Sequence, residues 1–141
     1  MNKNELAKKV VESMMELDYF SQWLGIEIIE IKENYSKLKM IVRKGMLNGF
    51  GIAHGSIAFA LADSAFAFAC NSDGKITVAL DVSISFPKAA KENDVIIAEA
   101  KQINQTNKTG LYLIEVKNQH NELVALFKGT CYKTEKNVEL K

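Results

Sequence analysis

Residues 55–71, GSIAFALADSAFAFACN, constrain the fold of this chain more than any other segment. Before the terminal asparagine, every residue is small, aliphatic or aromatic apart from Ser56, Asp63, Ser64 and Cys70. A helix that is apolar on every face belongs inside a protein. We therefore expect these residues to form a central helix that the rest of the chain wraps.

A single carboxylate, Asp63, interrupts this apolar segment. Moving a charge out of water without a partner costs at least roughly several kcal/mol. A carboxylate in this segment therefore needs a structural or a chemical role. A structural acid could bond a strand or a neighbouring subunit. The glycines Gly49, Gly51 and Gly55 favour a catalytic role, because they lead into a helix start whose unpaired N–H groups can hold a developing oxyanion.

Length and composition restrict the class of protein. The 141 residues have room for one domain with a real core. A formal net charge of +1 gives no electrostatic reason to expect nucleic acid as a partner. Cys70 and Cys131 suit a reducing compartment better than a disulfide, and the charged N-terminus has no apolar secretory region. The apolar segment is short for a membrane span and contains Asp63, so we expect a soluble cytoplasmic protein without a membrane partner.

The remaining periodicity predicts one N-terminal helix followed by an antiparallel sheet. Apolar residues at helical spacing indicate a helix over about residues 3–20. Residues 25–44 form an expected hairpin with its turn at Glu33–Asn34, and further strands are expected near residues 76–86, 94–104, 110–118 and 123–134. Candidate core residues of the hairpin are Ile26, Ile28, Ile31, Leu38, Met40 and Val42.

Residues 76–86 alternate strictly between apolar and other residues. This period of two is typical of a strand whose apolar side chains share one face. The residues expected on that face are Ile76, Val78, Leu80, Val82, Ile84 and Phe86.

Together these elements predict one α+β domain over residues 1–141, with its core at about residues 25–134. Consecutive strands joined by short turns pair antiparallel. Because the apolar helix must be wrapped, we expect the sheet to curl around it and a second copy of the chain to bury the remaining surface. This arrangement is the hotdog architecture.

The loop before the helix carries a recognisable pattern. Asn48, Gly51, His54 and Gly55, followed by an apolar helix with Asp63, resemble the signature of the PaaI-type acyl-CoA thioesterases of the hotdog superfamily, approximately Asn-x-x-Gly-x-x-His-Gly-Gly and then Ala-Asp. The similarity continues through the Phe86-Pro87 junction and residues 116–129, so that it spans residues 25–134. One departure is Ser56, which replaces the second glycine of His-Gly-Gly and is well tolerated at a helix start.

The resemblance implies a thioesterase that forms homodimers with two sites at the interface, often paired further as a dimer of dimers. Helix geometry points the same way, since Gly55 and Asp63 are separated by roughly 12 Å along the axis. Both cannot contact one thioester carbonyl, because catalytic groups lie about 3 Å from the atoms they serve. If both act in one reaction, Gly55 of one subunit faces Asp63 of the other.

For thioester hydrolysis we expect the Gly55 N–H to stabilise the oxyanion. Asp63 is either a general base for water or a nucleophile that forms an anhydride, and both roles stay open. Asn48 would orient the water or the carboxylate. His54 either shapes the loop, with a minor catalytic effect, or contacts the substrate.

Two serines are candidate substrate-binding residues, Ser56 at the helix start and Ser64 beside Asp63. Ser64 could orient the acyl group or water, or it could be an ordinary helix hydroxyl. The phenylalanines Phe50, Phe59, Phe66, Phe68 and Phe86 are expected mostly in the core, with one or two lining an acyl pocket.

Other chemistries are disfavoured by the residue inventory. The two histidines, His54 and His120, cannot form a multi-histidine metal site, and no Gly-x-Ser-x-Gly elbow, Walker loop or dinucleotide fingerprint occurs. We therefore expect no metal or other cofactor, with coenzyme A present only as part of the substrate. The alternatives are a non-catalytic acyl-CoA-binding protein and a hotdog enoyl-CoA hydratase or dehydratase. A phenylacetyl-type acyl group is implied by the resemblance alone, and short or medium acyl chains fit the same motif.

Overall fold

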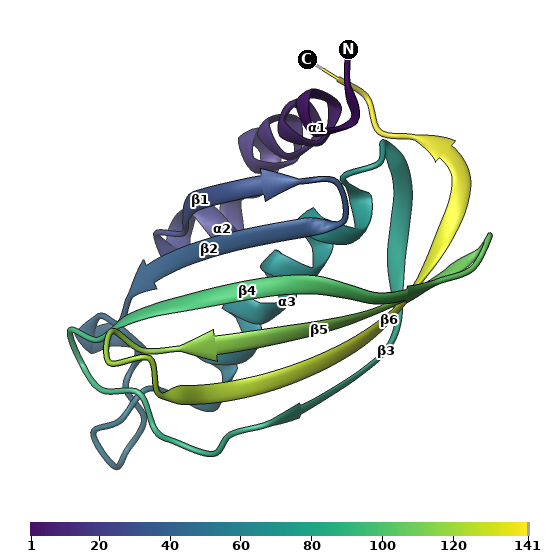
Figure 1. Cartoon of the computed structure of the whole chain (residues 1–141). Coiled ribbons are helices and arrows are strands. Elements are labelled where there is room, and N and C mark those ends of the chain that lie inside the picture. Colours follow the sequence, from purple (N-terminus) through teal and green to yellow (C-terminus); the bar gives the residue numbers. More distant parts are fainter. Residues whose placement is uncertain (141) are drawn as a thin grey trace.

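The computed structural model describes residues 1–140 and shows an antiparallel sheet curled around one central helix (Figure 1). The strands are β1 (Glu27–Lys32), β2 (Tyr35–Ile41), β3 (Lys75–Ser85), β4 (Val95–Gln105), β5 (Thr109–Lys117) and β6 (Leu123–Asn137). They lie in the order β1-β2-β4-β5-β6-β3, and every neighbouring pair is antiparallel. The central helix, α3 (Gly55–Asn71), has the predicted bounds, and a 3₁₀ turn, η1 (Lys44–Met46), precedes its loop. The α+β hotdog arrangement expected from the sequence is confirmed.

The N-terminal segment contains two helices, α1 (Lys3–Leu17) and α2 (Tyr19–Leu24), where one helix over residues 3–20 was expected. Between them, Asp18 leaves the helical conformation, with φ −88° and ψ 77°. Its carboxylate accepts a hydrogen bond from the Ser21 N–H at 3.0 Å and thus caps α2. A side chain that caps a new helix ends the preceding one, so the prediction of one continuous helix was wrong.

The hairpin of β1 and β2 turns at Glu33–Asn34 as predicted, with Asn34 at a φ of 60°. The buried members of the expected core are Ile26, Ile31, Leu38, Met40 and Val42. Ile28 was wrongly assigned to the core, since its side chain is 39% exposed. Ile28 lies opposite the buried Leu38 and so shares its face, but β1 is an edge strand and covers this position incompletely.

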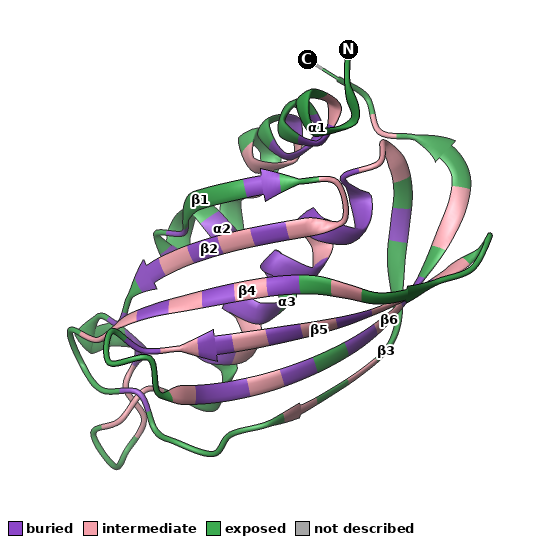
Figure 2. Ribbon diagram, viewed as in Figure 1, coloured by how far each residue is buried: buried purple, intermediate pink, exposed green. Residues whose placement is uncertain are grey.

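Strand β3 also departs from its predicted face. Its register with β6 shifts twice, and the second shift leaves Leu80 unpaired between Ala79 and Asp81. As a result Thr77 is buried whereas Val78 is exposed, so the apolar residues of the strand do not share one face as expected. The exposed ones are Ile76, Val78, Leu80 and Phe86, whereas Val82 and Ile84 pack against the core. At the end of the sheet, β3 pairs only with β6 and is exposed along most of its length (Figure 2).

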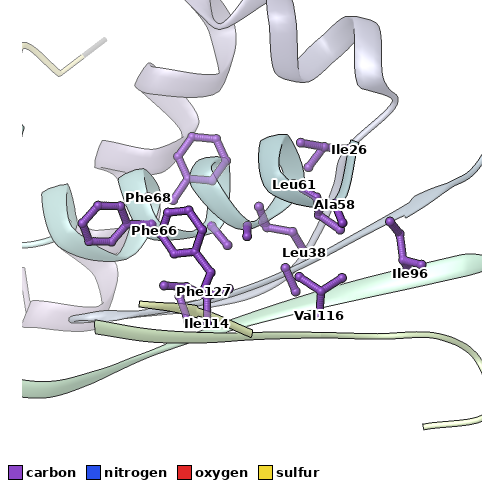
Figure 3. Packing of buried hydrophobic residues seen from close by; sticks show 14 of the residues in the cluster. Ile26, Leu38, Ala58, Leu61, Phe66, Phe68, Ile96, Ile114, Val116 and Phe127 are labelled. Atoms are coloured by element: carbon purple, nitrogen blue, oxygen red, sulfur yellow. The ribbon is translucent and has the colours of Figure 1, made fainter. Parts of the chain in front are cut away.

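Aromatic packing sets the spacing between α3 and the sheet (Figure 3). The ring of Phe66 lies 5.7 Å from the rings of both Phe127 and Tyr112. The same ring lies against the backbone of Gly129 in β6, where an added Cβ would meet the Phe66 ring at 2.7 Å. A glycine is required at this position because any side chain would push the helix from the sheet.

We therefore expect Gly129→Ala to lower the free energy of unfolding by about 1–3 kcal/mol, the usual cost of overpacking a core. Gly45→Ala is the matched control, because an added Cβ at Gly45 has no atom within 4 Å, and its effect should stay within about 0.5 kcal/mol. Urea denaturation of both variants measures the difference. Equal stability of the two variants would show that the Phe66 ring does not set this spacing.

Candidate active site

A cavity of about 230 Å³ opens at the N-terminal end of α3. Its lining residues are Asn48, Ile52, Ala53, His54, Gly55, Ala58, Phe86, Lys88, Ala89, Ala90, Ile96 and Val124. The structure thus brings together three of the predicted site residues, Asn48, His54 and Gly55. An apolar wall with a few convergent polar groups is typical of a small-molecule site.

The loop between η1 and α3 is shaped by the side chain of Asn48. Its Oδ1 accepts hydrogen bonds from the backbone N–H groups of Phe50 at 2.9 Å and Ile52 at 3.4 Å. Gly51 completes the turn with a φ of +77°, a conformation that favours glycine. Within residues 1–140 no group bonds the Asn48 side-chain NH₂, so this donor is available to a ligand in the cavity.

His54 and Gly55 form the start of α3. His54 is the N-cap, and its Nδ1 accepts a hydrogen bond from the Ser56 N–H at 3.1 Å, while the Ser56 Oγ lies 2.7 Å from the same nitrogen. Gly55 is the first helical residue. A Cβ added to it would lie 3.5 Å from the Phe86 ring, which is an ordinary van der Waals contact. The first N–H groups of a helix have no intrahelical partner, which leaves the Gly55 N–H as a donor at the positive end of the helix dipole.

Asp63 lies outside this cavity. It belongs to a stripe on α3 at helical spacing, formed with Ser56, Ala60 and Ala67, that neither the sheet nor the N-terminal helices fully cover. Asp63 is exposed in the single chain, on the part of the helix surface that a second copy was expected to bury. The sheet encloses one side of α3, and α1 and α2 cover only part of the other.

The surroundings of Asp63 disfavour its charge. Partial burial, followed by the nearby negative charge of Asp18, raises the pKa of the Asp63 carboxyl above its ordinary value. Asp18 is held in place by Ser21, whose N–H and Oγ donate to the carboxylate at 3.0 and 2.6 Å. A carboxylate with a raised pKa is a stronger base, which suits acid–base chemistry near neutral pH.

Ser64 is directed to α2 rather than to the cavity. Its Oγ lies 2.8 Å from the Ser21 Oγ, and both serines are buried. The hydroxyl therefore ties α2 to α3 in the single chain, and a role in substrate binding stays a prediction.

Sequence reasoning missed Asp18, because no motif links a residue in the N-terminal segment to Asp63. Lys88, which lines the cavity and pairs with Glu122 at 3.3 Å, gave no signal beyond being one of many lysines. Of the phenylalanines, Phe66 and Phe68 are buried as expected, Phe59 is half-buried, Phe86 lines the cavity, and Phe50 is 91% exposed at the tip of the loop.

Residues 1–140 contain no group of three His, Cys, Asp or Glu side chains placed to hold a metal ion. No helix in this range has the length and apolar character required to cross a membrane. The absence of a cofactor stays a prediction.

The raised pKa of Asp63 predicts a pH-dependent effect on stability. A carboxyl whose pKa is higher in the folded than in the unfolded state favours folding when protonated, and stability is lost as the pH rises through the folded pKa. Asp63→Asn should therefore have a higher Tm than the wild type at pH 7, and the difference should vanish below the ordinary Asp pKa of 3.8. Asp63→Glu, which keeps the charge, should show no comparable gain. Thermal unfolding of the three proteins between pH 7 and a pH below 3.8 measures these Tm values. An Asp63→Asn variant with the same Tm as the wild type at pH 7 would contradict the prediction.

Comparison with known proteins gives consistent matches. Residues 50–125 match the thioesterase superfamily. The chain is 47% identical over 131 residues to a protein of Archaeoglobus fulgidus, covering 93% of this chain and 85% of that protein. It is 40% identical over 121 residues to the acyl-coenzyme A thioesterase PaaI of Escherichia coli, covering 86% of each.

Solved structures agree with these sequence matches. The structure of the E. coli PaaI protein from the phenylacetic acid degradation operon superposes with a TM-score of 0.95 at 36% identity, over 98% of this chain and 100% of that chain. A hypothetical thioesterase protein of Streptococcus pneumoniae, solved with coenzyme A, superposes with a TM-score of 0.82 at 25% identity, over 88% and 98% of the two chains.

Proposed function

We propose that this chain, which belongs to the thioesterase superfamily and is a thioester hydrolase of the hotdog-fold PaaI type, hydrolyses acyl-CoA esters of an aromatic, phenylacetyl-type acid or of a short or medium fatty acid. The observation that carries this proposal is the cavity at the start of α3, where Asn48, His54 and Gly55 meet an apolar wall. Coenzyme A bound to the streptococcal relative supports the thiol half of the substrate. The apolar side chains of Phe86, Ile96 and Val124 support the acyl half.

Gly55 supplies the electrophilic part of the mechanism. Its N–H, at the positive end of α3, donates a hydrogen bond to the thioester carbonyl oxygen and stabilises the negative charge that develops there. The side-chain NH₂ of Asn48 is a second donor lining the cavity. Both donors are held before substrate arrives, Gly55 by the helix and Asn48 by its bonds to Phe50 and Ile52.

Asp63 supplies the base or the nucleophile. In the general-base route it takes a proton from water, the oxygen of the water bonds to the carbonyl carbon, and the C–S bond breaks to release the thiolate, which is then protonated. In the nucleophilic route the carboxylate displaces the thiolate to form an anhydride, which water then cleaves. The raised pKa of Asp63 makes its carboxylate both a stronger base and a stronger nucleophile, so it is compatible with either route.

The reaction site is shared between two copies of the chain in this proposal. Asp63 lies outside the cavity that contains Gly55 of the same chain, and the stripe around it is left open. Strand β3 contacts α3 and presents an unpaired edge with Val78 and Leu80 exposed. An exposed edge strand pairs readily with another strand, so two β3 edges can join two sheets and bring the two copies of α3 together. A further dimer of dimers, a role in phenylacetate degradation and a cytoplasmic location stay predictions.

The activity is tested by thiol release from a panel of phenylacetyl-, benzoyl- and fatty acyl-CoA esters. We expect the wild type to hydrolyse at least one class, and Asp63→Asn to lower kcat by about 10²–10⁴-fold because it removes the base or nucleophile. Wild-type protein that binds these esters without releasing thiol would instead be a binding protein. Equal rates in both proteins would remove Asp63 from the mechanism.

Shared sites are tested by mixing two inactive variants. Gly55→Pro removes the N–H at the first helical position, where proline is tolerated and where His54, with φ −59° and ψ 138°, already has a compatible conformation. It should lower kcat by about 10²–10³-fold. Gly55→Ala keeps the N–H and is the matched control, with activity expected within about tenfold of the wild type.

Unfolded and co-refolded Gly55→Pro and Asp63→Asn chains should regain activity together. With random pairing half of the dimers are hybrids, and each hybrid has one intact site of two, so about a quarter of wild-type activity should return. If the mixture is no more active than its components, Gly55 and Asp63 do not meet across an interface.

A further inference from the structure

Two groups of one residue, Ser56, contact the Nδ1 atom of His54. The Ser56 backbone N–H lies 3.1 Å from Nδ1, and the Ser56 Oγ lies 2.7 Å from it. A backbone N–H can only donate, so Nδ1 must be the acceptor and carries no proton. In the neutral ring the proton then resides on Nε2, for which the described residues provide no hydrogen-bond partner.

We infer that Ser56 is a positioning residue that keeps His54 in the Nε2–H tautomer, with this N–H presented to the thioester. His54 lines the cavity together with Gly55, and its Nδ1 edge is already engaged by the helix. The Nε2–H edge is therefore the part of the ring that remains for a ligand. This inference rests on the proposed thioesterase function and adds a third donor to those of Gly55 and Asn48.

The tautomer matters because a thioester carbonyl offers only acceptors. With the proton on Nδ1, the bare Nε2 would present a lone pair to the carbonyl oxygen or to the departing sulfur, and the contact would be repulsive. With the proton on Nε2, the same ring donates as charge develops. In the Nε2–H form the Ser56 hydroxyl adds a second donor to Nδ1 across 2.7 Å, whereas in the Nδ1–H form the ring proton would face the backbone N–H.

Ser56 is the position at which this sequence departs from the thioesterase pattern. The thioesterase pattern that the loop resembles has a glycine at this position, which has the backbone donor but no hydroxyl. Ser56→Gly thus returns the pattern to its usual form, Ser56→Ala removes only the hydroxyl, and Ser56→Thr keeps it. A hydroxyl that merely stabilised the start of α3 would leave the His54 tautomer unchanged in all three variants.

The tautomer can be read directly by ¹⁵N–¹H NMR of the imidazole nitrogens in the free protein, at about pH 8.5, where an ordinary imidazole is neutral. The chain has only two histidines, so His120 is an internal reference. We expect the Nε2–H form of His54 in the wild type and in Ser56→Thr, and a measurable fraction of the Nδ1–H form in Ser56→Ala and Ser56→Gly. An Nδ1–H ring in the wild type, or no change in Ser56→Ala and Ser56→Gly, would overturn the inference.

A double-mutant cycle with His54→Ala then connects the tautomer to the reaction. Ser56→Ala should lower kcat by about two- to tenfold, the usual effect of one hydrogen bond, with KM little changed and Ser56→Thr restoring the rate. In the His54→Ala background the same substitution should have no further effect on kcat. An equal loss in both backgrounds would contradict the positioning role. Because the NMR experiment needs no substrate, an inactive protein with a locked tautomer would contradict the thioesterase proposal and leave the tautomer lock standing.

Discussion

The need to cover α3 determines the rest of the structure. Most of the surface of this helix is apolar. The hydrophobic effect therefore favours a sheet that curls around it and removes this surface from water. Phe66 resting on the bare backbone of Gly129 sets how closely helix and sheet approach. Ser36 of β2 also links the sheet to α3, because its Oγ donates a 2.6 Å hydrogen bond to the Ala65 carbonyl.

One helix provides two chemically different groups for the site. The N-terminal turn of α3 has the Gly55 N–H, unbonded in the described part of the chain, and the positive end of the dipole, which suit an electrophilic centre. The middle of the helix holds Asp63 in surroundings that disfavour its charge, which suits a base. The rigid helix keeps the Gly55 N–H and the Asp63 carboxylate apart, so the carboxylate cannot bond this N–H within a single chain. In our proposal the two groups meet only when two chains associate.

Local sequence patterns predicted the fold well, because the bounds of α3 and the strand sequence follow from hydrophobic periodicity and turn residues. The errors occur where pairing between strands decides the outcome. Val78 points away from the core because a bulge shifts the register of β3, and an alternating sequence contains no sign of a bulge. Ile28 lies opposite the buried Leu38 yet is exposed because β1 is an edge strand, which its own sequence does not show. Within the cavity, Asn48, His54 and Gly55 meet because they are close in sequence, whereas the proximity of Asp18 to Asp63 arises only after α2 docks on α3.

Asp18 lies outside the loop and helix that carry the proposed catalytic groups, yet it helps to set the pKa of one of them, Asp63. Asp18 caps α2 in the N-terminal segment, outside residues 50–125 that match the superfamily, yet its charge contributes to raising the pKa of Asp63. Substitutions at the junction of α1 and α2 can therefore change the acidity of this carboxyl while the loop and α3 keep their residues. Related proteins with the same loop could in this way diverge in working pH through their N-terminal helices alone.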